Sequence, residues 1–497
     1  MLQLEEIKRI IQDDSTSDKK RLAKKGQAYY QGEHDILQYR LFYYNADGNL
    51  VEDKTRSNTK IPHPFFTELV DQATQYMLSG KDGFVKSDNP GLQKELDKYF
   101  NDSEDFQAEL AELLTGCMSK GFEYMYAYKN ANDKISFMCA DSIGVIEVEA
   151  RFASDEKDHV IYWYIDRIDK EKKKIKRIMD WDSQQTFYYV QADDGKIKPD
   201  NCFNGSNSKP HILYKEGYDE NTYYDGFGFI PFFRLDNNKK QISDLKTIKP
   251  LIDDYDLMAS SLSNNLVDFD TPIHVVKGFE GDSLDELQQN LKTKKIIGME
   301  STDAGAGVEI KTVDVPFEAR KVKLELDEKN IYRFGFGLNT QGLKDTSATT
   351  NIAIKAAYSL LDLKKSKLEI RLKQFLRKLL KPVLDEINAE NKTDYESSDV
   401  YFEFNPEIMS NAQENAQIEL TDAQKKQVIV NILLSVAQLF DDETIMINLC
   451  DVLEIDYEEI KDKLPKSEEE NTMEAQNVLN GVVTDERQAE GNLTITT

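Results

Sequence analysis

The chain has few of the residues that mark a disulfide-linked or a metal-binding protein. Its 497 residues include only four cysteines, Cys117, Cys139, Cys202 and Cys450. They are scattered and form no C-x-x-C pair, so the sequence excludes a disulfide framework and predicts reduced thiols. The five histidines are equally far apart, which favours structural or surface roles over metal binding. We therefore expect no bound metal.

Long apolar runs are also missing. No stretch approaches the roughly 20 apolar residues that a membrane-spanning helix needs. The N-terminal sequence MLQLEEIKRIIQDD is acidic and amphipathic, whereas a signal peptide is basic and then apolar. Together with the reduced thiols, these two absences predict a cytoplasmic protein with no membrane partner.

Positive charge is in short supply. The chain has 63 Lys and Arg against 90 Asp and Glu, a formal net charge of −27. Tight non-specific binding to DNA needs many contacts between basic side chains and phosphates, so this charge argues against it. It does not exclude DNA as cargo, because an acidic wall lets a polyanion slide without sticking. With 40% hydrophobic residues, the chain can still bury a large core and form several modules.

Motifs for catalysis are absent as well. Gly80–Lys81 does not complete a phosphate-binding loop, and GFGLNT at Gly335–Thr340 lacks the third glycine of a dinucleotide fingerprint. There is no H-E-x-x-H and no G-x-S-x-G. We interpret the acidic cluster at Asp155, Glu156 and Asp158 as a solvated hairpin turn. The sequence thus predicts no catalytic residue and no cofactor, with a metal-dependent nuclease as the weaker alternative.

Two amphipathic helix patterns are the most informative features that are present. The first spans Thr247–Asp268, and the second spans Pro316–Phe334. The second helix is too charged to lie in the core of a monomer, so we expect it to pack narrowly against neighbours. The residues predicted to pack these helices are Leu251, Tyr255, Met258, Leu262, Phe317, Leu324 and Ile331.

The segments around these helices suggest a ring subunit. Thr271–Val315, between them, contains short β-like runs and a small helix. Gly335–Asn351 follows as a loop, and an amphipathic helix then begins that could reach Asn388, with Pro382 expected to kink or end it. A chain that goes out along one helix, returns along another and turns into a long spoke fits a conduit better than a catalytic pocket.

The loop after the second helix is small and polar. One reading is a floppy connector. The functional reading is a mobile loop that lines a pore and touches a passing polymer weakly, through hydroxyl and amide groups. The residues predicted to do so are Asn339, Thr340, Gln341, Lys344, Asp345, Thr346, Ser347 and Thr349.

The remaining patterns define the fold class as α+β and mainly α-helical. Alternating aromatic and β-branched residues in Glu123–Gln191 predict an antiparallel β meander. NADGN at Asn45–Asn49 is a turn signal between two tyrosine-rich strands. Two helices are expected near Asp422–Leu439 and Asp442–Leu449. The tail from Pro465 is acidic and polar, a composition typical of disorder.

Three blocks of sequence carry a resemblance to a known family. They are YYQGEHDIL at Tyr29–Leu37, NTKIPHPFFTELVDQATQYMLSG at Asn58–Gly80, and the long run from Ile230 to Phe269. Together with the order of helices, they resemble the portal (connector) proteins of tailed double-stranded-DNA bacteriophages, in the branch of long-tailed phages of Gram-positive hosts. The resembling region spans roughly Tyr29 to Asn388.

The resemblance implies a ring, usually of twelve subunits, at one vertex of the virion capsid. Its parts would be a wing at 1–246 that contains the meander, stem helices at 247–270 and 316–334, and a small α/β clip at 271–315. A tunnel loop would follow at 335–351, then a long wing helix and strand at 352–406, a crown at 407–464 and an acidic tail at 465–497.

The resemblance also implies partners. These are double-stranded DNA as cargo, the large subunit of the terminase motor, a head–tail adaptor, and the major capsid and scaffolding proteins. A structural ring or adaptor that conducts nothing is the first alternative to this function.

Overall fold

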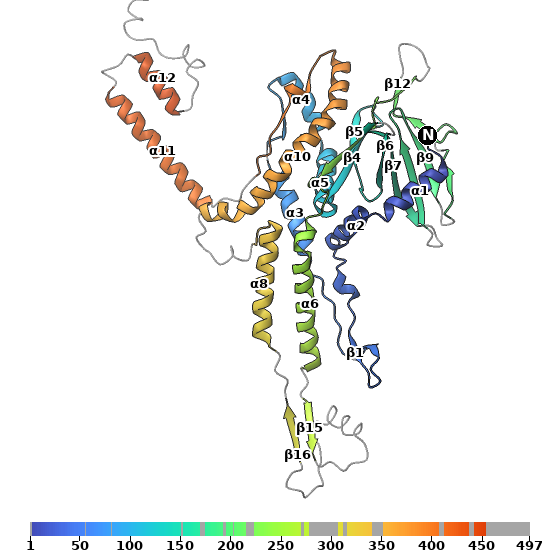
Figure 1. Ribbon diagram of the computed structural model, residues 1–497. Helices are drawn as coiled ribbons and strands as arrows, with labels where there is room; N and C mark the ends of the chain where they lie inside the picture. The colour runs from blue at the N-terminus through green and yellow to red at the C-terminus, as the bar shows by residue number, and fades with distance from the viewer. Residues whose placement is uncertain are drawn as a thin grey trace, which may run out of the picture. The chain divides into compact units, whose positions relative to one another are not determined.

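Figure 1 shows the computed structural model of the chain, which forms two compact units, Met1–Met409 and Ser410–Thr497. The structure describes residues 2–54, 56–80, 82–150, 153–168, 174–191, 195–201, 203–214, 223–269, 273–277, 307–311, 316–339, 351–406, 412–436 and 442–453. Helices and antiparallel sheets alternate along the first unit, which confirms the α+β class.

Several helices form the N-terminal part of the first unit, and some of them begin at residues whose side chains satisfy free amide groups. They are α1 (Leu4–Ser15), α2 (Asp18–Tyr30), α3 (Phe65–Leu78), α4 (Pro90–Tyr99) and α5 (Glu104–Lys120). The side chains of Ser17, Asn89 and Ser103 accept hydrogen bonds from the first turns of α2, α4 and α5, as N-cap residues do. Gly121 ends α5 at a φ of +98°, which glycine adopts readily.

The predicted meander is present as a sheet in which consecutive strands pair. Its path runs β10-β9-β8-β7-β6, with β6 (Val145–Ala150), β7 (Ala153–Ile168), β8 (Lys174–Trp181), β9 (Gln185–Gln191) and β10 (Ile197–Pro199). The short strand β11 (Ser208–Pro210) also pairs with β9. Ile7 and Ile11 of α1 are buried in one cluster with strand residues of this sheet, including Ile161 and Ile178.

Two details of the predicted meander were wrong. Its first strands, β4 (Phe122–Lys129) and β5 (Ile135–Ala140), belong to a separate sheet in which β14 (Phe232–Asp236) pairs with β4. The acidic cluster at Asp155, Glu156 and Asp158 lies within β7 rather than in a hairpin turn. The register explains this, because β6 and β7 pair as far as Ala150 and Ala153, before the cluster begins.

Four two-stranded antiparallel pairs complete the strands that the structure describes in the first unit. The predicted turn at Asn45–Asn49 joins β1 (Phe42–Tyr44) to β2 (Leu50–Glu52). The other antiparallel pairs are β12 (Ile212–Tyr214) with β13 (Tyr223–Asp225), β15 (Ile273–Lys277) with β16 (Gly307–Lys311), and β17 (Tyr401–Phe402) with β3 (Val85–Lys86).

The three long helices of the first unit match the sequence patterns, with shifted ends. They are α6 (Leu245–Phe269), α8 (Phe317–Gly335) and α10 (Asn351–Asn391). Helix α6 begins two residues before Thr247, and α10 continues through Pro382 instead of ending there. The buried side chains of α10 join α3, α5 and the start of α6 in the largest core cluster.

The second unit contains α11 (Ala412–Ser435) and α12 (Asp442–Leu453), where two helices were predicted. Large apolar side chains on α11 are exposed, among them Leu420, Val428 and Ile432. The acidic tail lies outside the described residues. None of the helices in the described ranges is both long and apolar enough to cross a bilayer.

Candidate functional site: the paired helices and their anchors

Helices α6 and α8 lie side by side and are joined by a polar bridge (Figure 1). Lys323 of α8 donates to Asp254 of α6 at 2.5 Å and to Asp327 one turn along its own helix. Asp327 is only 3% exposed, so this ammonium group is the hydrogen-bond donor to a buried carboxyl group. The two hydrogen bonds raise the pKa of Lys323 above its usual value. The bridge therefore fixes the pairing of the two helices.

The seven predicted packing residues differ in burial along the pair. Ile331 is fully buried in the core of its own chain, while Leu251, Tyr255, Met258, Leu262 and Leu324 are half-buried. Phe317, at the start of α8, is 48% exposed. One end of the pair is thus fixed in the first unit's core, and the other end presents bare apolar side chains. The exposed set is Leu266, Val267 and Phe317 at that end, Val322 and Leu326 further along α8, and Phe334 near the core end.

An extended segment, residues 57–63, is fastened along α6. Backbone amides of alternate residues donate to side chains spaced one helical turn apart. The pairs are Ser57 to Asp268, Thr59 to Asn264, Ile61 to Ser260 and His63 to Asp256, at 2.7–3.3 Å. Two extended residues rise by roughly 6.6 Å, and four helical residues by about 6.0 Å. The two repeats therefore stay in step over three turns.

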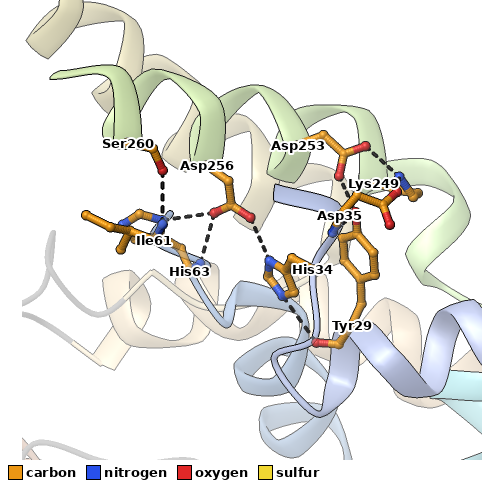
Figure 2. A network of polar contacts seen from close by, with 9 residues as sticks. All are labelled: Tyr29, His34, Asp35, Ile61, His63, Lys249, Asp253, Asp256 and Ser260. Atoms are coloured by element: carbon orange, nitrogen blue, oxygen red, sulfur yellow. Dashed lines mark hydrogen bonds and ion pairs between the residues drawn. The ribbon is translucent and has the colours of Figure 1, made fainter. Parts of the chain in front are cut away.

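Asp256 is the centre of this fastening (Figure 2). One carboxylate oxygen lies 2.6 Å from Nδ1 of His34, and the other lies 2.9 Å from Nδ1 of His63. The side chains of Asp256 and His34 are 0% exposed. Burial alone would raise the pKa of Asp256, but the hydrogen bonds from His34 and His63 outweigh it and hold the pKa below its usual value.

A second group of contacts ties the end of α2 to α6. Tyr29 donates its hydroxyl to Asp253, and its ring stacks on His34 with centroids 4.5 Å apart. Lys249 bridges Asp253 at 2.6 Å and Asp35 at 2.7 Å. Burial would raise the pKa of Asp35, but the hydrogen bonds from Lys249 and Lys25 lower it to about 2. Figure 2 shows both groups of contacts on one side of α6.

The exit from α8 is fixed to α3. Gly335 and Gly337 lie so close to Leu69 that a Cβ atom on either would overlap its side chain. The side chain of Gln72 accepts from the amide of Leu338 at 2.9 Å and donates to its carbonyl at 3.1 Å. Phe336 has a left-handed φ of +60°, a conformation that costs a non-glycine residue energy. The chain therefore leaves α8 in one defined direction.

The predicted loop residues start where this anchor ends. Asn339 donates to Glu328 of α8 at 3.3 Å. Thr340, Gln341, Lys344, Asp345, Thr346, Ser347 and Thr349 lie outside the described residues, so their role stays a prediction. The structure defines the two ends of the loop, at Asn339 and at the start of α10.

The anchoring residues were not predicted from the sequence. His34, His63 and Asp256 are polar residues far apart in the chain, and their spacing carries no motif. The sequence contains only an indirect indication of these residues, because all three lie in the blocks that carry the family resemblance. Within the described part of the chain, no three His, Cys, Asp or Glu side chains are grouped to hold a metal ion. The contacts here are thus structural, between a helix and the segments that brace it.

Comparisons with known proteins agree with the resemblance. A family model described as "Phage portal protein, SPP1 Gp6-like" matches residues 8–474. The portal protein of Bacillus phage SPP1 is 26% identical over 386 residues, which cover 75% of this chain and 73% of that protein. The portal protein of Clostridium phage phiCD119 is 28% identical over 429 residues, covering 84% and 89%.

Proposed function

The chain belongs to the SPP1 Gp6-like family of phage portal proteins, and from this premise we propose how its parts form a DNA channel. Identical subunits, twelve in the usual ring of this family, assemble into a ring at one vertex of the capsid. Double-stranded DNA enters through the central hole during packaging and leaves through it at ejection. The subunit itself catalyses no reaction, and it needs no cofactor.

One observation supports this proposal most strongly. The pair α6–α8 is fixed in the core at one end, and the 57–63 segment braces α6 from Asp256 to Asp268, while Phe317, Val322 and Leu266 are exposed. Large exposed apolar groups near one another favour a protein interface. A rod that is rigid at its base and apolar at its far end suits a stem that packs against copies of itself.

The elements then take the following parts. Helices α6 and α8 are the stem, and the hairpin β15–β16 belongs to the clip. The segment from Asn339 to the start of α10 is the tunnel loop, and α10 with the sheets forms the wing. Helices α11 and α12 belong to the crown. The clip would dock the terminase large subunit during packaging and the head–tail adaptor afterwards, and the wing would face the major capsid and scaffolding proteins.

The acidic charge fits transport of DNA. A wall with few free cations releases few counterions from the duplex, so it holds DNA weakly and friction stays low. Within the tunnel loop, Lys344 would contact phosphates briefly, and Asp345 would limit the strength of that contact. The ring would assemble in the host cytoplasm and become a component of the virion.

Electron microscopy of the purified full-length chain tests the channel. We expect rings whose hole admits a duplex roughly 20 Å wide, a width set by the dimensions of B-DNA. Rings with a narrower hole would mean a non-conducting adaptor, and compact single particles at high concentration would contradict the proposal. Incubation of the chain with DNA and Mg²⁺ tests the nuclease alternative. A conduit leaves the DNA uncut, whereas a nuclease cleaves it.

The loop is tested separately in virions. Lys344→Ala and Asp345→Ala should change how much DNA is packaged or retained, while capsid assembly stays normal. Normal packaging and retention in both variants would remove these two residues from the mechanism and leave the ring intact.

A further inference from the structure

The hairpin β1–β2 is built unlike the rest of the first unit. Its five large apolar side chains are all exposed, namely Phe42 (50%), Tyr43 (47%), Tyr44 (74%), Leu50 (59%) and Val51 (37%). An isolated two-stranded hairpin is at best marginally stable in water. A hairpin with apolar groups on both faces is therefore expected to pack against something more.

One face of the hairpin is the more apolar and the more exposed. Tyr44 pairs with Leu50 across the strands, and Phe42 lies two residues before Tyr44. Residues paired across two strands, or two apart along one strand, share a face. Phe42, Tyr44 and Leu50 thus form one apolar surface, which we name the hairpin face.

The hairpin is fastened to α6 through the segment that follows it. Its return strand leads into the 57–63 segment, which is bonded to Asp256, Ser260, Asn264 and Asp268 of α6. On another side of α6, Asp254 contacts Lys323 of α8. Figure 1 shows the hairpin, α6 and α8 in this order, with the hairpin beside the end of α6 that is farther from the core.

A second bare apolar surface lies at the opposite end of this row. Val322 is 61% and Leu326 is 53% exposed, and residues four apart share one face of a helix. This outer face of α8 is about half a turn away from Asp327 and Ile331, which face the chain's own interior. The first half of α8 also carries the exposed charges Glu318, Lys321 and Glu325, while the hairpin carries Asp47 and Glu52, the latter paired with Arg40.

We propose that the hairpin face of one subunit packs on the outer face of α8 in the next subunit, as an arm that links neighbouring stems. This inference rests on the proposed ring. The hairpin face and the outer face of α8 are different surfaces, so their contact is head-to-tail. A repeated head-to-tail contact closes into a ring when the rotations between neighbouring subunits add up to a full turn. Rotation about the axis of a ring keeps heights unchanged, so the hairpin meets the same level of the next stem.

Cysteine cross-linking of the full-length chain tests the contact. Tyr44→Cys combined with Val322→Cys, and separately with Leu326→Cys, should give a ladder of disulfide-linked oligomers that extends to the whole ring after mild oxidation. Each single variant should give dimers at most, and the unaltered chain should give none of this ladder. Cys117 and Cys450 are buried, so they should contribute little to the background.

A pair of charge variants tests how much the contact between the hairpin face and α8 contributes to assembly. Tyr44→Asp should raise the protein concentration needed for half-assembly at least tenfold, because the acid would be buried in the contact. Ala46→Asp adds the same charge at the exposed turn, two residues away, and should change that concentration less than twofold. Circular dichroism of both variants should match the unaltered chain, since Tyr44 is 74% exposed in the single subunit.

The outcomes separate this inference from the proposed function. If rings form normally but neither double variant gives a ladder, the proposed arm contact is wrong and the ring is not. The same conclusion follows if Tyr44→Asp assembles as readily as Ala46→Asp. The hairpin would then be covered by a different protein. If the unaltered chain forms no ring at any concentration, the proposed function fails, and the arm fails with it.

Discussion

Asn264 of α6 and Thr59 of the 57–63 segment exchange two hydrogen bonds, like neighbours in a β-sheet. The amide of Thr59 donates to Oδ1 of Asn264 at 2.7 Å, and Nδ2 of Asn264 donates to the carbonyl of Thr59 at 3.2 Å. The carboxamide carries a donor and an acceptor and so replaces the missing partner strand. An extended chain can thus lie along a helix without leaving its backbone groups unpaired.

Asn264→Ala should weaken this fastening without disturbing the helix. It removes both bonds, and a partly exposed pair of this kind is expected to contribute about 1–2 kcal/mol. We expect the amide of Thr59 to exchange with deuterium roughly 5–30-fold faster in the variant. Ser263→Ala, one residue away on α6, is the matched control and should leave the exchange rate of Thr59 unchanged. Equal rates in both variants would show that the segment is held by other contacts.

Asp256 should make the stability of the stem base depend on pH. Its pKa is depressed in the folded chain, so its contribution is fully present above the ordinary value of 3.8 and is lost as the pH falls below that value. We therefore expect the melting temperature of the unaltered chain to fall as the pH drops from 5 to 3, and Asp256→Asn to flatten part of this fall. Thermal melts at several pH values measure both.

The same residue can be removed outright as a second test. Asp256→Ala leaves the buried His34 without its partner, and leaving a buried polar group without a hydrogen bond costs about 1–3 kcal/mol. His63→Ala removes the half-exposed partner and should cost much less, since screening weakens such a pair. Similar losses in the two variants would contradict the central role assigned to His34 and Asp256.

Amphipathic periodicity predicted the long helices but not what braces them. The stripe from Ile248 to Leu262 and the spacing of Phe317, Leu324 and Ile331 gave α6 and α8 to within a few residues, because burial of one face follows helical geometry. The fastening of residues 57–63 joins polar groups about 200 residues apart. Asp256, Ser260, Asn264 and Asp268 recur every four residues, but polar side chains at this spacing are usual on the solvent face of a helix. Only the folded chain therefore shows that they bind the 57–63 segment.

Burial on the longest helix was predicted only in part. Phe375, Leu376 and Leu379 are buried, as the apolar pattern of α10 indicates, but Leu363 and Ile370 are 59% and 64% exposed. A sequence pattern identifies apolar faces without saying whether the same subunit covers them. The Asn45–Asn49 turn was predicted from its residues alone, whereas the exposure of the strands beside it required the structure.

Gly337→Ala should loosen the anchor at the exit of α8. Its new Cβ would overlap Leu69, which is 2% exposed and has little room to move. Overpacking of this kind costs about 1–3 kcal/mol. Combining it with Leu69→Ala should recover part of that loss, because the shortened side chain makes room. Denaturant unfolding of the two single variants and the double variant measures the coupling, expected at about 0.5–3 kcal/mol. Additive losses would show that the two residues do not press on each other.

Tyr332 should contribute to a loss of stability at alkaline pH. Its hydroxyl, on α8, donates to Glu68 of α3 at 2.7 Å. Burial and this hydrogen bond raise the pKa of Tyr332 above its ordinary value of 10.0, so its contribution is fully present below pH 10 and is lost as the pH rises beyond it. Tyr332→Phe should cost roughly 2 kcal/mol at neutral pH and should make the decline of melting temperature between pH 9 and 11 shallower. Tyr224→Phe, at a side chain that is 56% exposed, is the matched control and should change neither. If Tyr332→Phe leaves the alkaline decline as steep as before, Glu68 and Tyr332 do not hold α8 against α3.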